Sequence, residues 1–243
     1  MFALLRKEIA TFFSSLTGYL VIVVFLLATG LFLWVIPGEM NILFSGYASL
    51  EPLFELAPWI YLFLVPAVTM RAFADEKKSG TLELLLTRPV TALQIVGAKY
   101  FATLLVVVLS LLPTLIYYFS VYRLGNPVGN LDVGGTWGSY IGLLFLAAVY
   151  VAIGVFTSSL TDNQIVAFVL AVLLCFVFYI GFESLASIPA LQSWQNGIVN
   201  LGIEAHYRSI SRGVVDSRDL VYFTGMVVVF LYLTKVVLDS RKW

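Results

Sequence analysis

The sequence predicts an all-α polytopic membrane protein with six transmembrane helices, an N-terminal interfacial helix and a partly re-entrant outer loop before the last span. Composition is the first observation behind this prediction. Of the 243 residues, 60% are hydrophobic and 12% are charged, and the mean hydropathy of +0.97 is too high for a water-soluble domain of this length. The second observation is a succession of long apolar runs, several of which reach the ~20 residues that cross a bilayer. Because no internal repeat is apparent, residues 1–243 are expected to form one membrane domain.

Residues 1–16 precede the first long apolar run and show helical periodicity. Apolar side chains recur there at steps of three and four residues, which places them on one face of a helix. That face consists of Phe2, Leu5, Ile9, Phe12, Phe13 and Leu16, and the opposite face of Lys7, Thr11 and Ser14, with Arg6 at its edge. Such a helix is expected to lie in the membrane interface. The alternative is a simple extension of the first span.

The apolar runs predict where the six spans lie. They cover residues 17–36, 56–70, 100–122, 136–157, 164–182 and 220–238. A secretory signal peptide is the competing interpretation of the first run, but that run is longer than a typical signal core and no clear cleavage motif follows it. Pro58 and Pro66 in the second span predict kinks whose freed carbonyl groups are satisfied within a bundle. Pro113 lies near the middle of the third span.

The segment 71–99 is the long charged interruption of the sequence and holds five of its fourteen Lys and Arg residues. A short helix is expected within it. Gly80 and Thr81 predict a turn into an N-cap, Glu83 lies in the first turn, where negative charge suits the helix dipole, and Pro89 ends the helix one residue earlier. Its apolar body consists of Leu82, Leu84, Leu85 and Leu86. Six or seven helical residues span only ~10 Å, so this helix fits a groove in a soluble partner better than a bilayer.

Three further stretches of the sequence are predicted to begin or contain helices. Thr91 and Gln94 have the spacing of a capping box, which opens the helix that leads into the third span. Asp162 or Asn163 is expected to N-cap the fifth span after a tight hairpin. The outer loop 184–219 contains half-apolar pieces that suit interfacial or re-entrant helices. In that loop Glu204 and Arg208 have the i,i+4 spacing of a helical ion pair.

Charge placement predicts the orientation of the spans. An even number of spans puts both termini on one side, and with that side cytoplasmic, ten basic residues lie inside and four outside, which agrees with the positive-inside rule. The inner set is Arg6, Lys7, Arg71, Lys77, Lys78, Arg88, Lys99, Lys235, Arg241 and Lys242, and the outer set is Arg123, Arg208, Arg212 and Arg218.

Motifs for catalysis and metal binding are absent from the sequence. No stretch matches G-x-x-x-x-G-K-[ST], so ATP hydrolysis by a P-loop is not expected in this chain. His206 is the only histidine and Cys175 the only cysteine, which argues against a metal site and excludes an intrachain disulfide. The formal net charge of zero gives no basic surface for nucleic acid. Glu183 is the ionisable residue nearest to a span interior, and we interpret it either as a functional charge or as a side chain that reaches the interface.

The 71–99 segment resembles the coupling segment between the second and third spans of type-2 ABC exporter permeases. The resemblance rests on Glu76, the run 80–85 (GTLELL), Pro89 with Val90, and the run 97–99 (GAK). It extends to the N-terminal helix, the six spans, the hairpin SSLTDNQIVA and the long outer loop, and so covers essentially the whole chain. A narrower resemblance, carried by HYRSISRGVVDSRDLVYF, is to the permease subunits of bacteroidete gliding-motility ABC transporters.

The resemblance implies a half-transporter in the bacterial inner membrane, with cytoplasmic termini. Two permease chains, identical or different, would pair, and a cytosolic P-loop ATPase subunit that carries ATP and Mg²⁺ would dock beneath each, so this chain would need no cofactor of its own. The residues implied to contact the ATPase are Arg6, Lys7, Glu76, Gly80, Thr81, Glu83, Leu84, Leu85, Leu86, Arg88 and Pro89.

Two other function classes remain open from the sequence. The first is a membrane-embedded transferase or hydrolase that uses His206, Asp216 and Glu204 of the outer loop for acid–base chemistry, although no spacing points to it. The second is a passive scaffold of a motility or secretion machine, which would differ from a permease only in lacking nucleotide-dependent movement.

Overall fold

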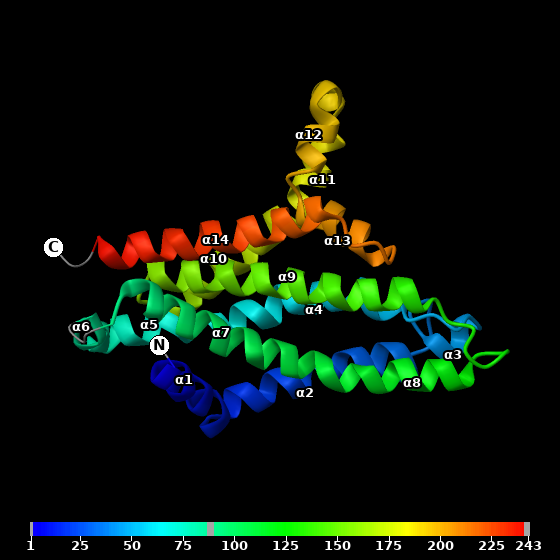
Figure 1. The fold of residues 1–243 in the computed structure, drawn as a ribbon, viewed down its shortest axis with the longest axis horizontal. Coiled ribbons are helices and arrows are strands. Elements are labelled where there is room, and N and C mark those ends of the chain that lie inside the picture. Colours follow the sequence, from blue (N-terminus) through cyan, green and yellow to red (C-terminus); the bar gives the residue numbers. More distant parts are fainter. Residues whose placement is uncertain (1, 87–89, 241–243) are drawn as a thin grey trace.

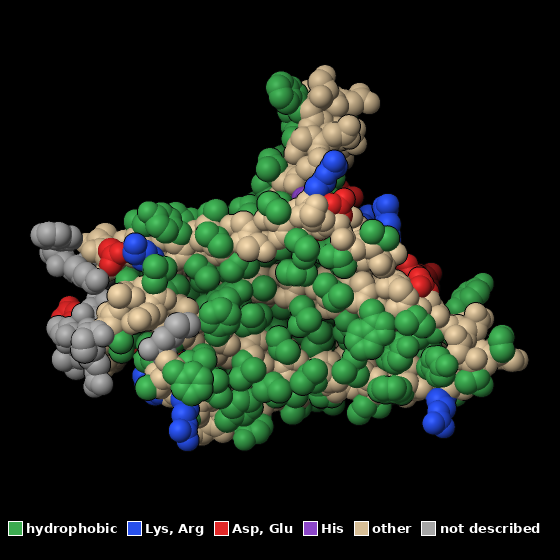
Figure 2. Space-filling model, viewed as in Figure 1, with side chains coloured by type: hydrophobic (Ala, Val, Ile, Leu, Met, Phe, Trp, Pro, Cys, Tyr) green, Lys and Arg blue, Asp and Glu red, His purple; other side chains and the backbone are tan. Residues whose placement is uncertain are grey.

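A computed structural model describes residues 2–86 and 90–240, and these residues are 83% helical with no strands. Six helical segments within them are long and apolar enough to cross a membrane, which confirms the predicted all-α polytopic class. Their ribbons run roughly side by side along the long axis of the molecule (Figure 1). Figure 2 shows hydrophobic side chains across the middle of one face, while charged side chains gather near its two ends and beside the base of a protrusion.

The first two helices are separate. α1 spans Phe2–Ser14 and α2 spans Leu16–Gly30, continued by a π-helical turn at Leu31–Val35. Ser15 between them is extended, with φ −102° and ψ 159°, so residues 2–14 are no simple extension of the first span. The location of α1 in a membrane interface stays a prediction.

The second span is longer than its apolar run. α4 spans Glu51–Thr69 and leads almost directly into α5 at Arg71–Lys78, whereas the hydropathy pattern placed the start near residue 56. Glu51 and Pro52 form the first turn, where proline costs no backbone hydrogen bond and an acidic side chain suits the dipole. Hydropathy marks only the part of a helix that suits hydrocarbon, so it misses polar turns at either end.

The third span likewise begins before its apolar run. α7 spans Ala92–Leu111, a 3-10 turn covers Leu112–Thr114, and α8 spans Leu115–Leu124. Pro113 lies in the 3-10 turn. Thr91 forms the predicted capping box with Gln94 at the start of α7, so that prediction is confirmed.

The fourth span, α9 at Val133–Leu160, is the central helix of the bundle. In its most apolar stretch 72% of the residues are buried, against 17% in α14. α9 packs against α4, α5, α7, α10, α13 and α14. Its contact with α4 is closest at Gly154, where an added Cβ would lie 2.0 Å from Oγ1 of Thr69. The small residue therefore allows the two helices to approach.

The rest of the chain forms the fifth and sixth spans and the outer loop. α10 spans Gln164–Phe176 after Asn163, whose side chain accepts from the N–H groups of Ile165 and Val166 and so is the N-cap. The remaining elements are a π-helical turn at Val177–Gly181, α11 at Phe182–Ala186, a 3-10 helix at Pro189–Trp194, α12 at Gln195–Val199, α13 at Ile203–Ser211 and α14 at Ser217–Asp239. The short α3 at Ile42–Ser45 lies between the first two spans.

The outer loop folds into short helices, as expected. α11 and α12 project crosswise from the bundle, whereas α13 returns to lie along it (Figure 1), packed on α9 and α14. Re-entry of the protruding part into a bilayer stays a prediction.

Candidate functional site

The 71–99 segment lies at one end of the bundle and forms α5, α6 at Thr81–Leu86 and the start of α7. The beginning of α1 and the end of α14 lie at this same end (Figure 1). An even number of spans required this arrangement of the termini, and the fold confirms it. The described part of the segment, residues 71–86 and 90–99, is therefore largely helical.

α6 is held by its N-terminal turn and by one apolar side chain. Gly80 has φ +69°, a left-handed conformation that glycine adopts without steric cost. The helix begins at Thr81 itself, and its hydroxyl donates to the carbonyl oxygen of Glu76 at 3.4 Å, so Thr81 belongs to the first turn and not to the expected N-cap position. Leu82 is 4% exposed, Leu85 is half-buried against the core, and Glu83 is exposed.

For four of the residues predicted to contact the ATPase, the structure describes no side chain. Leu84 and Leu86 lie in α6, but the structure describes only their backbone. Arg88 and Pro89, with the predicted helix end, lie outside the described residues. On the neighbouring helix α1, Arg6 and Lys7 are both exposed.

Ser158 fastens α5 to the central helix α9. Its hydroxyl oxygen accepts from the backbone N–H groups of Phe73 at 3.0 Å and Ala74 at 3.1 Å, and its own hydroxyl donates to the carbonyl oxygen of Met70 at 2.9 Å. All three bonds cross between elements more than 80 residues apart in sequence. Since a break between α4 and α5 frees these backbone groups, Ser158 satisfies polar atoms that would otherwise be buried without partners.

Two longer side chains reinforce the attachment of α5. The amino group of Lys77 donates to the carbonyl oxygen of Ser159 on α9. The side-chain amide of Gln164 on α10 donates to the carboxylate of Asp75. α5 is therefore bonded to the end of the fourth span and to the beginning of the fifth.

A charge cluster, formed by the buried Lys99 and the half-buried Glu8 and Glu76, joins three helices. Lys99 on α7 is 3% exposed, and its Nζ lies 2.8 Å from Oε1 of Glu76 on α5 and 3.4 Å from Oε1 of Glu8 on α1. The same ammonium group lies 5.2 Å from the ring centroid of Phe73, within the range of a cation–π contact. Lys7 adds an exposed pair to Glu8 at 3.4 Å.

The charge cluster places an ammonium group where burial is costly. Taking ions out of water costs several kcal/mol each, which is offset only if the charges stay paired. One carboxylate oxygen of Glu76, Oε2, is buried with no hydrogen-bond partner among the described residues. A cavity of about 290 Å³ adjoins the cluster and is lined by all three of its members. The buried ammonium group and its two half-buried carboxylates fix the relative positions of α1, α5 and α7.

Glu8 is the member of the cluster that the sequence reasoning missed. Its partner Lys99 lies 91 residues away along the chain, so no local spacing connects the two. One feature of the sequence could have drawn attention to Glu8: it is the first acidic residue and the only one before Glu39.

The residues considered for acid–base catalysis are not brought together. Nδ1 of His206 lies 2.6 Å from Asp219, and its Nε2 lies 2.9 Å from the carbonyl oxygen of Asn200. Asp216 instead N-caps α14 by accepting from the N–H of Arg218 at 3.0 Å, and that hydrogen bond lowers the pKa of its carboxyl. His206 therefore ties α13 to α14, as a locally bonded histidine.

Glu204 forms the predicted ion pair with Arg208, at 2.5 Å. Arg208 also lies 3.9 Å from Glu183, whose side chain is half-exposed. Burial raises the pKa of Glu204 to about 7, assisted by a hydrogen bond with Glu183 and opposed by the guanidinium group. No group of three or more His, Cys, Asp or Glu side chains within residues 2–86 and 90–240 has a geometry that could hold a metal ion.

Comparison with protein families gives a match over most of the chain. The family model described as "ABC-2 family transporter protein" matches residues 44–201, well over half of the chain. This range contains the whole 71–99 segment, the central helix and the hairpin to α10. None of the curated proteins matches the chain.

Proposed function

The chain belongs to the ABC-2 family of transporter proteins, whose members are transmembrane permeases, and we propose that α6 receives the movement of a separate ATPase subunit. ATP and Mg²⁺ would bind to that ATPase, in keeping with the absence of a P-loop motif from this sequence. The permease would convert the closing of the ATPase into a rearrangement of its spans.

The observation that carries this proposal is the attachment of α5. Hydrogen bonds and ion pairs join it to α9 through Ser158, to α10 through Gln164, and to α7 and α1 through Lys99 and Glu8. A force that α6 passes to α5 would therefore reach the central helix through these bonds. A rigid link of this kind suits a lever better than a passive loop.

The exposed surface around α6 supplies the proposed docking face. Glu83 and Thr81 are exposed on α6, and Arg6 and Lys7 are exposed on the neighbouring α1. In the proposed orientation this end faces the cytoplasm of a bacterium, because ten basic residues then lie inside and four outside. A second permease chain, identical or different, would complete the transporter within the inner membrane.

The experiment is co-purification with the ATPase subunit. Glu83→Lys reverses one exposed charge without touching the core, so loss of the ATPase from the purified complex is expected. Leu85→Asp should have the same effect by a second route, since it places a carboxylate where a half-buried leucine packs α6 against the core. Glu39→Lys, an exposed charge reversal at the opposite end of the bundle, is the matched control. Full retention of the ATPase by both α6 variants would refute the docking assignment.

A role in gliding motility is the narrower proposal, supported by the likeness of the stretch 206–223 to permeases of that system. Deletion of the gene in a gliding bacterium that carries it should abolish spreading while leaving growth intact. Normal gliding of the deletion strain would refute this role and leave the permease assignment untouched. ATPase stimulation on co-reconstitution separates a permease from a passive scaffold, which would give none.

A further inference from the structure

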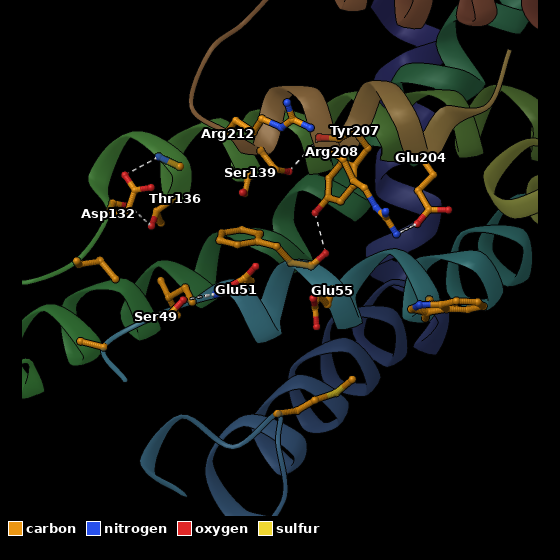
Figure 3. A pocket seen from close by; sticks show the side chains of 18 of the residues that line it. Ser49, Glu51, Glu55, Asp132, Thr136, Ser139, Glu204, Tyr207, Arg208 and Arg212 are labelled. Carbon is orange, nitrogen blue, oxygen red and sulfur yellow. Dashed lines mark hydrogen bonds and ion pairs between the residues drawn. The ribbon is translucent and has the colours of Figure 1, made fainter. Parts of the chain in front are cut away.

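A second site lies at the end of the bundle opposite to α6. It is a pocket of about 880 Å³, bounded mainly by α4, α9 and α13, and we call it the far pocket. Figure 3 shows Glu51 and Glu55 on α4, Ser139 on α9, and Arg208 on α13 around this space. None of its lining residues belongs to the 71–99 segment.

One face of α4 supplies two carboxylates and an aromatic ring. Glu51, Glu55 and Trp59 line the far pocket, and their spacing of four residues places them one above another on a helix. Both glutamates are exposed, and neither forms an ion pair with a residue that the structure describes. The ring of Trp59 meets Tyr179 edge-on, with centroids 6.0 Å apart. Negative charge and aromatic surface are thus combined on one wall.

Two side chains that are almost fully buried also line this space, and their hydroxyl groups have no partner among the described residues. Tyr179 and Ser139 are each 5% exposed and border the far pocket. Among the described residues neither side chain forms a hydrogen bond, although neither hydroxyl is sealed from the pocket. Buried hydroxyl groups normally have partners, so these two are available to a ligand. This observation is independent of the glutamates.

The wall formed by α13 carries both positive and negative side chains. Arg208 is held between Glu204 at 2.5 Å and Glu183 at 3.9 Å, so its charge is already offset. Arg212 is exposed, at the rim. Asp132, which accepts from the N–H of Gly135, lines the pocket as well, so four carboxylates face two guanidinium groups and the surplus charge of the far pocket is negative. An anionic ligand would be repelled by this surplus, whereas a cation would be attracted to it.

We propose that the far pocket binds the ammonium group of an organic amine, which Glu51 and Glu55 neutralise while the exposed ring of Trp59 packs against its alkyl substituents. Aromatic rings beside carboxylates are a chemistry that recognises substituted ammonium groups. The hydroxyl groups of Ser139 and Tyr179 bind the polar remainder of the ligand. The same ammonium chemistry occurs in free amines and in the headgroups of phosphatidylcholine and phosphatidylethanolamine.

The test uses choline and its neutral isostere, 3,3-dimethylbutan-1-ol, with the full-length protein in nanodiscs. Calorimetric titration should detect binding of choline and none of the isostere, because the two differ only in charge. Glu51→Gln with Glu55→Gln should weaken choline binding by about tenfold or more. Glu39→Gln, which removes an exposed carboxylate that does not line the far pocket, should leave it unchanged. Trp59→Leu provides a second variant that keeps both carboxylates.

A second arm identifies the source of the ammonium group. Native mass spectrometry of protein from nanodiscs that mix phosphatidylcholine, phosphatidylethanolamine and phosphatidylglycerol should reveal a retained zwitterionic lipid if the ligand is a headgroup. That retention should be lost in the double variant. Choline binding without lipid retention assigns the site to free amines instead. The proposal is overturned if neither arm detects binding, if the isostere binds as well as choline, or if the double variant behaves as the parent protein.

Discussion

The two ends of the bundle treat charged side chains in opposite ways. At the α6 end, Lys99 is buried and paired with Glu8 and Glu76, and the polar groups of α5 are bonded to α9 and α10. At the far end, Glu51 and Glu55 are exposed beside an open pocket and have no counter-ion among the described residues. Charged side chains that pair within the protein hold helices in place, whereas charged side chains that border a cavity without a counter-ion are available to bind a ligand.

The largest expected effect is that of Lys99→Ala. Two half-buried carboxylates would lose their common counter-ion, which should lower the free energy of unfolding by about 3 kcal/mol. Denaturation in micelles, followed by circular dichroism, measures this loss. Lys235→Ala is the control, because its pair with Asp239 at 3.9 Å is partly exposed and should contribute at most about 1 kcal/mol. Equal stability of the two variants would contradict the structural role of the charge cluster.

The next effect is that of Gly154→Ala, which tests the closeness of α4 and α9. The new methyl group would lie 2.0 Å from Oγ1 of Thr69, so the helices must move apart at a cost of about 1–3 kcal/mol. Gly225→Ala on α14 is the matched control, since an added Cβ there meets nothing within 4 Å. That variant should be neutral or slightly stabilising, because alanine favours a helix over glycine. An unchanged free energy of unfolding in Gly154→Ala would mean that α4 and α9 are not in close contact at this position.

Ser158→Ala should have a somewhat smaller effect on stability and a larger one on function. It leaves the N–H groups of Phe73 and Ala74 buried without an acceptor, at about 1–2 kcal/mol. If α5 is a lever, ATP-driven transport should fall while ATPase binding is retained. Ser159→Ala is the control, since that hydroxyl donates only to the carbonyl oxygen of Phe156 within its own helix. Equal transport by both serine variants would argue against the lever.

The smallest expected effect is a dependence of stability on pH at the far end. The pKa of Glu204 is raised to about 7 in the folded protein from 4.5, so the folded state binds more protons than the unfolded state between these values. The contribution of Glu204 to the free energy of unfolding is therefore fully present below pH 4.5. It is lost as the pH rises through about 7. Glu204→Gln should flatten this part of the stability profile. An unchanged profile in that variant would show that another group causes the dependence.

Local sequence was sufficient for features that depend on neighbouring residues. The capping box of Thr91 and Gln94, the N-cap at Asn163 and the ion pair of Glu204 with Arg208 were all predicted and are confirmed. Each joins groups no more than four residues apart. Helix ends beyond the apolar runs were misplaced, as at Glu51, because hydropathy measures suitability for lipid and not helix formation.

The sequence by itself determined the membrane class, the number of spans and the position of the segment that contains α6, because apolar length and local spacing are written along the chain. Only the tertiary structure decided that Lys99 meets Glu8 and Glu76, that Ser158 bonds to α5, and that Tyr179 and Ser139 share a pocket with Glu51. These contacts join residues distant in sequence. They arise when helices pack, since burial then forces each polar group either to find a partner or to remain open to a ligand.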